Sequence, residues 1–138
     1  MASAAPGPVV TFPELTWNEE RHPLVISLHR PSARWMIELG TFWQATADPA
    51  ELRSFAESVL AVAEGSRTEL DGPLGTAPRH HLTEGDFIVG RDDDGLYLQV
   101  FLCDGSCGSP TLDASSLPPA ALTVQARALL AALPGDAE

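Results

Sequence analysis

Two histidines and two cysteines are the residues of this chain that are best suited to metal or thiol chemistry. His80 and His81 are adjacent, and Cys103 and Cys107 are separated by an Asp-Gly-Ser turn. Thiolate and imidazole are ligands that zinc prefers, so the four residues form a candidate zinc site. The same residues also allow three other interpretations: a Cys103–Cys107 disulfide, two free thiols, or a thiol nucleophile with a histidine as its base. Because the compact Cys-x-x-Cys or His-x-x-x-His spacing is missing, we expect no cofactor and keep a zinc- or thiol-dependent enzyme as the alternative.

Other common motifs of catalysis and ion binding do not fit the chain. The Asp92-Asp93-Asp94-Gly95 run starts like a calcium loop, but Cys103 stands where an EF-hand needs its bidentate Glu. The chain has no Lys, which excludes a phosphate-binding P-loop, and it has no Gly-x-Gly-x-x-Gly fingerprint. These patterns therefore favour a solvated hairpin tip at Asp92–Gly95 over a calcium or nucleotide site.

Acidic residues dominate the charge and gather in the second part of the chain. There are 19 acidic residues against 8 basic ones, which gives a formal net charge of −11 over 138 residues. Residues 1–47 hold 4 acids and 3 Arg, whereas residues 48–138 hold 15 acids and 5 Arg. This balance argues against nucleic acid and against an anionic membrane surface, because both need a basic footprint. A concentrated negative field instead suits a basic protein partner.

Two amphipathic helices are the clearest elements. One is predicted from Asp48 to Glu64, with Asp48 as the N-cap, Pro49 at the first helical position and Glu51 in a capping-box-like place. The other is predicted from Pro118 to Leu133, with an apolar stripe of Leu and Ala. Each helix must place its apolar stripe on another element.

Segments in which apolar and polar residues alternate are predicted to be strands, and the helices are expected to pack on them. We expect strands at Val9–Trp17, Leu24–Arg30, Arg34–Gln44 (with a bulge at Gly40), Phe87–Arg91 and Leu96–Cys103. The order β-β-β-α-β-β-α predicts an α+β two-layer sandwich, an antiparallel sheet of about five strands with two helices on one face. A single domain over residues 1–138 is expected, with disordered tails at 1–8 and 134–138.

The face of this sheet that points away from the helices is expected to carry Tyr97, Gln99 and Phe101 among polar groups. Such a mixed surface either binds a partner or is covered by the loop from Gly65 to Gly85. A small-ligand cleft lined by Trp35, Trp43 and Tyr97 is a further alternative.

The layout resembles that of small actinobacterial domains of unknown function and of WapI-type immunity proteins. The likeness covers about Val25 to Leu133 and rests on the element order, the Asp48-Pro49-Ala50-Glu51-Leu52 helix start and the Ala- and Leu-rich last helix. It implies strands, a central helix, a three-strand return and a final helix. The outline is also similar to that of secretion chaperones, whose N-terminal helix is missing here.

The main hypothesis is a non-enzymatic, immunity- or antitoxin-like module that neutralises or escorts a basic protein partner. It is expected in the cytoplasm, because no secretory signal and no membrane span are visible in the sequence. An exposed sheet edge could pair with that of a second copy, so a homodimer is a further expectation. The predicted partner-binding residues are acidic groups with two aromatic anchors, namely Glu84, Asp86, Asp92, Asp93, Asp94, Tyr97, Phe101 and Asp104.

Overall fold

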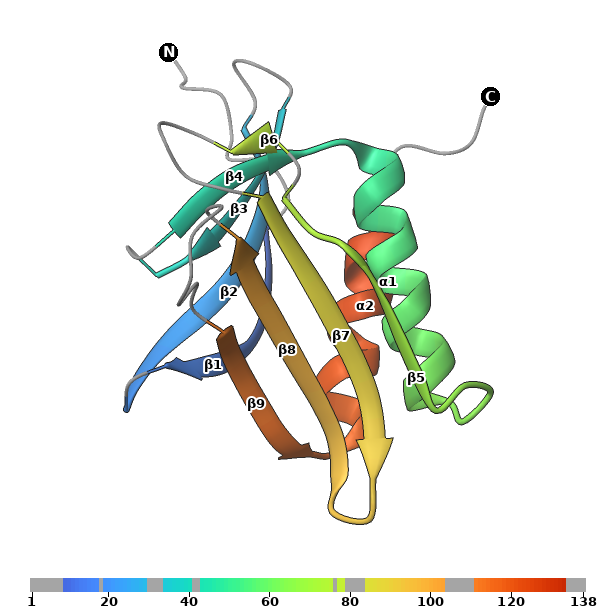
Figure 1. Cartoon of the computed structure of the whole chain (residues 1–138). Coiled ribbons are helices and arrows are strands. Elements are labelled where there is room, and N and C mark those ends of the chain that lie inside the picture. Colours follow the sequence, from blue (N-terminus) through green and yellow to red (C-terminus); the bar gives the residue numbers. More distant parts are fainter. Residues whose placement is uncertain are drawn as a thin grey trace.

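One antiparallel sheet of nine strands makes up most of the described part of the chain (Figure 1). The computed structural model describes residues 9–17, 19–29, 34–40, 43–75, 77–78, 84–103 and 111–133, so the two predicted tails lie outside it. The strands are β1 (Val9–Trp17), β2 (Glu20–His29), β3 (Arg34–Leu39), β4 (Trp43–Ala47), β5 (Glu69–Pro73), β6 (Ala77–Pro78), β7 (Glu84–Asp92), β8 (Gly95–Cys103) and β9 (Thr111–Leu117).

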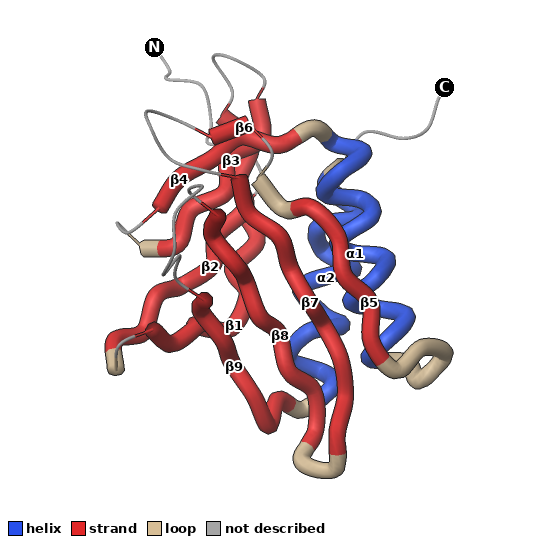
Figure 2. Tube along the Cα trace, in the orientation of Figure 1, coloured by secondary structure: helices blue, strands red, loops and turns tan. Residues whose placement is uncertain are grey.

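The strand order across the sheet is β5-β7-β8-β9-β1-β2-β3-β4-β6. The sheet curls around the helices α1 (Pro49–Ala63) and α2 (Pro119–Ala132), as Figures 1 and 2 show. The prediction of a five-strand, two-layer sandwich is therefore wrong. Within the described residues, four strands precede α1 and five follow it, and a strongly twisted sheet of this width curls where a narrow one stays open.

One missed strand arises at Gly40, where the chain reverses direction. Gly40 has φ +57°, a left-handed conformation that glycine adopts without a steric penalty. Its N–H donates to the Pro23 carbonyl oxygen at 3.0 Å. Beyond the turn, β4 pairs with β3 and places Trp43 opposite Leu39. The predicted Arg34–Gln44 strand with a bulge is thus a hairpin of two strands.

Three further strands were not predicted: the two-residue β6, which pairs with β4, and the more polar β5 and β9. β5 has the sequence ELDGP and pairs along its whole length with β7, while β9 has the sequence TLDASSL and pairs with β8. Leu112 is the buried residue of β9, and Leu70 of β5 is half-buried. β9 also packs Ala114 and Leu117 against the core, but one fully buried residue in β9 and none in β5 give too weak an alternation to predict either strand. Backbone pairing with the β7–β8 hairpin positions both strands.

Both helices pack on the inner face of the curled sheet. α1 contacts β5 and β7, α2 contacts β1, and the two helices contact each other. Three buried rings meet there, since Phe55 of α1 lies 4.8 Å from Phe87 of β7 and 5.3 Å from Phe12 of β1 between centroids. The predicted stripe on α1 is confirmed at Leu52, Phe55, Ala56, Val59 and Ala63.

The start of α1 differs from the predicted capping box. Asp48 is the N-cap and Pro49 opens the helix, but the Asp48 side chain makes no capping hydrogen bond. The Glu51 carboxylate accepts a hydrogen bond from the Gly75 N–H, beyond the end of β5. Glu51 therefore joins α1 to the segment after β5 instead of closing a local cap.

Candidate functional site

The outer face of β5, β7, β8 and β9 carries exposed carboxylates beside partly exposed apolar side chains. In β8 the side chains of Leu96, Leu98 and Val100 are buried, whereas Tyr97 and Phe101 on the opposite face are partly exposed. The predicted alternation of this strand is confirmed there. In Figures 1 and 2 the two described helices lie on the opposite side of these strands. The alternation of burial shows that Tyr97 and Phe101 face away from the core.

Cross-strand register places carboxylates and apolar groups side by side on this face. One row runs Pro73–Asp86–Phe101–Thr111, the next runs Asp71–Ile88–Gln99–Asp113, and a third runs Glu69–Gly90–Tyr97. Glu69, Asp71, Asp86 and Asp113 are exposed, and Ile88 and Phe101 are half-buried. We call this surface the acidic face, defined by Glu69, Asp71, Asp86, Ile88, Tyr97, Gln99, Phe101 and Asp113.

An open depression of about 320 Å³ lies in the acidic face between β5, β7 and β8. Its charged walls are Asp71 and Asp86, and its apolar walls include Ile88 and Phe101. Gly72 and Phe87 also line it, and a Cβ at Gly72 would lie 3.1 Å from the Phe87 ring. The depression thus combines two carboxylates with a partly exposed aromatic ring.

Tyr97 is held in place on this face by the residues across from it. Its hydroxyl donates to Glu69 Oε2 at 2.5 Å, and its ring covers Gly90, where a Cβ would lie 2.3 Å from the Tyr97 oxygen. The Glu69 hydrogen bond, with burial and the charges of Glu69 and Asp92, raises the pKa of Tyr97 to about 12. Tyr97 is therefore a neutral donor at physiological pH.

The predicted aspartate hairpin is confirmed, with Asp93 and Asp94 at the turn between β7 and β8. Asp92 Oδ1 accepts the Asp94 N–H at 2.9 Å, and Gly95 follows with φ +133°. This is the local role that short polar side chains take in turns. The three aspartates are exposed at the hairpin tip, beside Tyr97 and at the far end of the strands from Phe101.

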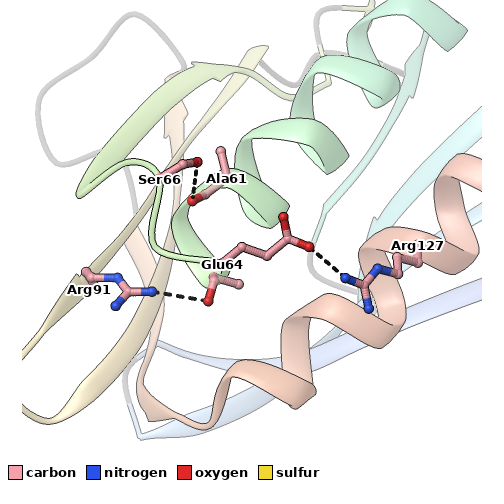
Figure 3. Close-up of polar contacts among 6 residues, drawn as sticks. Ala61, Glu64, Ser66, Arg91 and Arg127 are labelled. Atoms are coloured by element: carbon pink, nitrogen blue, oxygen red, sulfur yellow. Dashed lines mark hydrogen bonds and ion pairs between the residues drawn. The ribbon is translucent and has the colours of Figure 1, made fainter.

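Arg91 is the sole basic residue in the sequences of β5, β7, β8 and β9. Its guanidinium donates to the Val62 carbonyl oxygen at 2.6 and 3.1 Å and to that of Ala63 at 3.1 Å. Figure 3 shows the Arg91 side chain directed at the C-terminal end of α1. Arg91 therefore satisfies carbonyl groups at the C-terminal end of α1, and its charge is directed at the helix end. It does not neutralise the acidic face.

Several of the predicted residues cannot be placed relative to the acidic face. His80, His81, Asp104 and Cys107 lie outside the described residues, and for Glu84 and Cys103 the backbone alone is described. Within the residues that are described, no group of three or more His, Cys, Asp or Glu could hold a metal ion. The zinc and thiol hypotheses stay predictions.

The aromatic cleft proposed from the sequence does not form as expected. Trp35 is 3% exposed and belongs to the core, whereas Tyr97 lies on the outer face, so the sheet separates the two rings. The side chain of Trp43 lies outside the described part.

Sequence reasoning missed Glu69, Asp71 and Asp113 as members of the acidic face. The spacing Glu69-x-Asp71 is the available signal, because alternate residues of a strand share one face. A second open hollow, of about 530 Å³, lies where β9 meets β1 and is lined in part by Glu14, Arg21 and Asp113. The carboxylates thus continue from the acidic face onto the neighbouring strands.

No family model, curated protein or solved structure matches this chain in the comparisons with known proteins. In the part of the chain that the structure describes, none of the helices has the length and apolar character needed to cross a membrane. The resemblance to immunity proteins and secretion chaperones therefore stays a prediction.

Proposed function

We propose that this protein is a non-catalytic binding module whose acidic face binds a basic protein partner. The observation that supports the proposal is the register of the outer face. It gathers the exposed carboxylates of Glu69, Asp71, Asp86 and Asp113 around partly exposed apolar side chains. Carboxylates around an aromatic centre suit protein recognition, because charge speeds association and desolvated aromatic contacts carry much of the binding free energy.

The proposal separates the acidic groups by role. The carboxylates around the depression are placed to meet cationic side chains of the partner. Asp92 holds the hairpin turn, and Asp93 and Asp94 extend the negative field at its tip. We propose that the module neutralises or escorts its basic partner, as an immunity protein or antitoxin does.

Two charge-matched variants test the proposal. The first is Glu69→Gln/Asp71→Asn/Asp86→Asn, on the acidic face. The second, Glu19→Gln/Asp48→Asn/Glu57→Gln, removes the same charge from exposed residues elsewhere. Each variant and the unmodified protein are used to isolate complexes from the native host at low salt, and native mass spectrometry measures the complexes.

The expected result is a heavier complex with the unmodified protein and with the second variant, and its loss with the first. The complex should also dissociate as salt rises, because salt screens charges that lie at a surface. Equal loss with both variants would show that net charge alone retains the partner. A chain that stays free at low salt in all three cases would contradict the proposal.

A further inference from the structure

We infer that the depression between β5, β7 and β8 receives an arginine side chain of the basic partner. This inference rests on the proposed function and specifies the chemistry of its central contact. The guanidinium would lie between Asp71 and Asp86 and against the ring of Phe101, and the aliphatic part of the arginine would lie against Ile88. The four residues line one open depression of about 320 Å³.

The register brings the two carboxylates within reach of one guanidinium. Asp71 pairs with Ile88, and Asp86 stands two residues before Ile88 on the same strand face. Diagonal neighbours of this kind are roughly 7–8 Å apart, a gap that a planar group with five donors can bridge. Phe101 is directly across from Asp86 on β8, so its ring lies beside the same gap.

The residues that line the depression favour arginine over other cations. A hard metal ion prefers six or more oxygen ligands, whereas the depression offers two carboxylates beside apolar walls. Lysine would supply a compact, strongly hydrated charge. Arginine has a flat, weakly hydrated cation that stacks on an aromatic ring, and an apolar stem that covers Ile88.

The test compares two blocked peptides of equal length and charge, Gly-Arg repeats in one and Gly-Lys repeats in the other. Isothermal titration calorimetry at low salt measures both against the unmodified protein, Phe101→Leu and Phe101→Tyr. Asp86→Asn and Asp93→Asn form a matched pair, since each removes one exposed charge from the β7–β8 hairpin and Asp93 lies at its tip.

The unmodified protein should bind the Arg peptide about two- to fivefold more tightly than the Lys peptide, the factor that one exposed cation–π contact provides. Phe101→Leu should abolish this preference, and Phe101→Tyr, which keeps the ring, should retain it. Asp86→Asn should weaken binding of the Arg peptide more than Asp93→Asn does. Circular dichroism establishes that each variant is folded.

Equal affinity for the two peptides in the unmodified protein, or a preference that survives Phe101→Leu, would overturn the inference. The proposed function would still stand if the acidic-face triple variant weakened both peptides and its charge-matched control did not. It would fall together with the inference if the two triple variants bound the peptides equally well.

Discussion

At the residue scale, the position of Tyr97 depends on two residues of neighbouring strands, Glu69 and Gly90. Gly90 leaves the space that the Tyr97 ring occupies, and Glu69 accepts the hydrogen bond that the Tyr97 hydroxyl donates. Neither neighbour is evident from the sequence around Tyr97, because both come from other strands. The sequence predicted that Tyr97 faces outward, but it contained no signal for the partner of the hydroxyl.

The ionisation of Tyr97 gives the first prediction at this scale. Tyr97 is the chain's one tyrosine, so phenolate absorbance reports it alone, and we expect a midpoint at a pH of about 12. Glu69→Gln should move the pKa back toward 10.0, because it removes the carboxylate that accepts the Tyr97 hydrogen bond and, with it, the charge that opposes ionisation. An unchanged midpoint in Glu69→Gln would show that the hydrogen bond is not the main cause.

The same raised pKa sets the sign of a stability change with pH. The folded chain holds the Tyr97 proton more tightly than the unfolded chain, whose pKa stays near 10. The stabilising contribution is therefore full below a pH of about 10 and is lost as the pH rises toward about 12. Urea denaturation across this range should show a steeper loss of stability in the unmodified protein than in Tyr97→Phe.

Gly90→Ala tests the close packing of Tyr97 on β7. A Cβ at Gly90 would lie 2.3 Å from the Tyr97 oxygen, so the ring has to move. We expect a loss of about 1–3 kcal/mol in the free energy of unfolding, as for other overpacked sites, together with a lowered Tyr97 pKa. In the Tyr97→Ala background the same substitution should cost much less, and an equal cost there would contradict this packing.

At the scale of elements, the C-terminal end of α1 depends on residues far away in the sequence. Arg91 of β7 donates to the carbonyl oxygens of Val62 and Ala63, and Arg127 of α2 pairs with Glu64 at 2.6 Å (Figure 3). Gly65 follows the helix end with φ +93°. The two arginines thus join β7 and α2 to one helix end.

These two arginines are expected to differ in their effect on stability. Arg91→Ala should lower the free energy of unfolding by about 1–3 kcal/mol, because it removes charge-assisted hydrogen bonds to helix-end carbonyls. Arg127→Ala should cost at most about 1 kcal/mol, the range for exposed ion pairs. Chemical denaturation measures both, and a larger loss in Arg127→Ala would reverse this assignment.

The elements that the sequence predicted are those with a strong apolar period. Both helices and the β7–β8 hairpin have it, and their buried positions at Leu52, Phe55, Leu98 and Leu122 agree with the pattern. β5 and β9 have only a weak apolar period. Their backbone pairing with the β7–β8 hairpin holds them in the sheet. As a result, the sequence predicted the acidic-face residues Asp86, Tyr97 and Phe101 and missed Glu69, Asp71 and Asp113, which lie on β5 and β9.

At the scale of the whole molecule, the curled sheet packs on the two helices with one side (Figure 1). Its other side, over β5, β7, β8 and β9, carries the acidic face. The net charge of −11 is unevenly shared, and the outer face holds several of the carboxylates. Repulsion among them opposes folding, and binding of a basic partner would relieve it. A surface of this kind favours recognition at some cost in stability.

Salt should therefore stabilise the free protein. We expect the melting temperature to rise as sodium chloride is added from low ionic strength, because the ions screen the repulsion between surface carboxylates. The acidic-face triple variant should show a smaller rise than its charge-matched control. A melting temperature that falls with salt in the unmodified protein would mean that attractive ion pairs outweigh the repulsion.

The central claim, that the acidic face is the binding surface, is tested most directly by a residue-resolved NMR titration with the Gly-Arg peptide. The expected result is a set of amide shifts concentrated on β5, β7 and β8 around Asp71, Asp86 and Phe101, with little change at the exposed Glu57 of α1. Shifts spread evenly over all exposed carboxylates, or centred on the helices, would contradict the account.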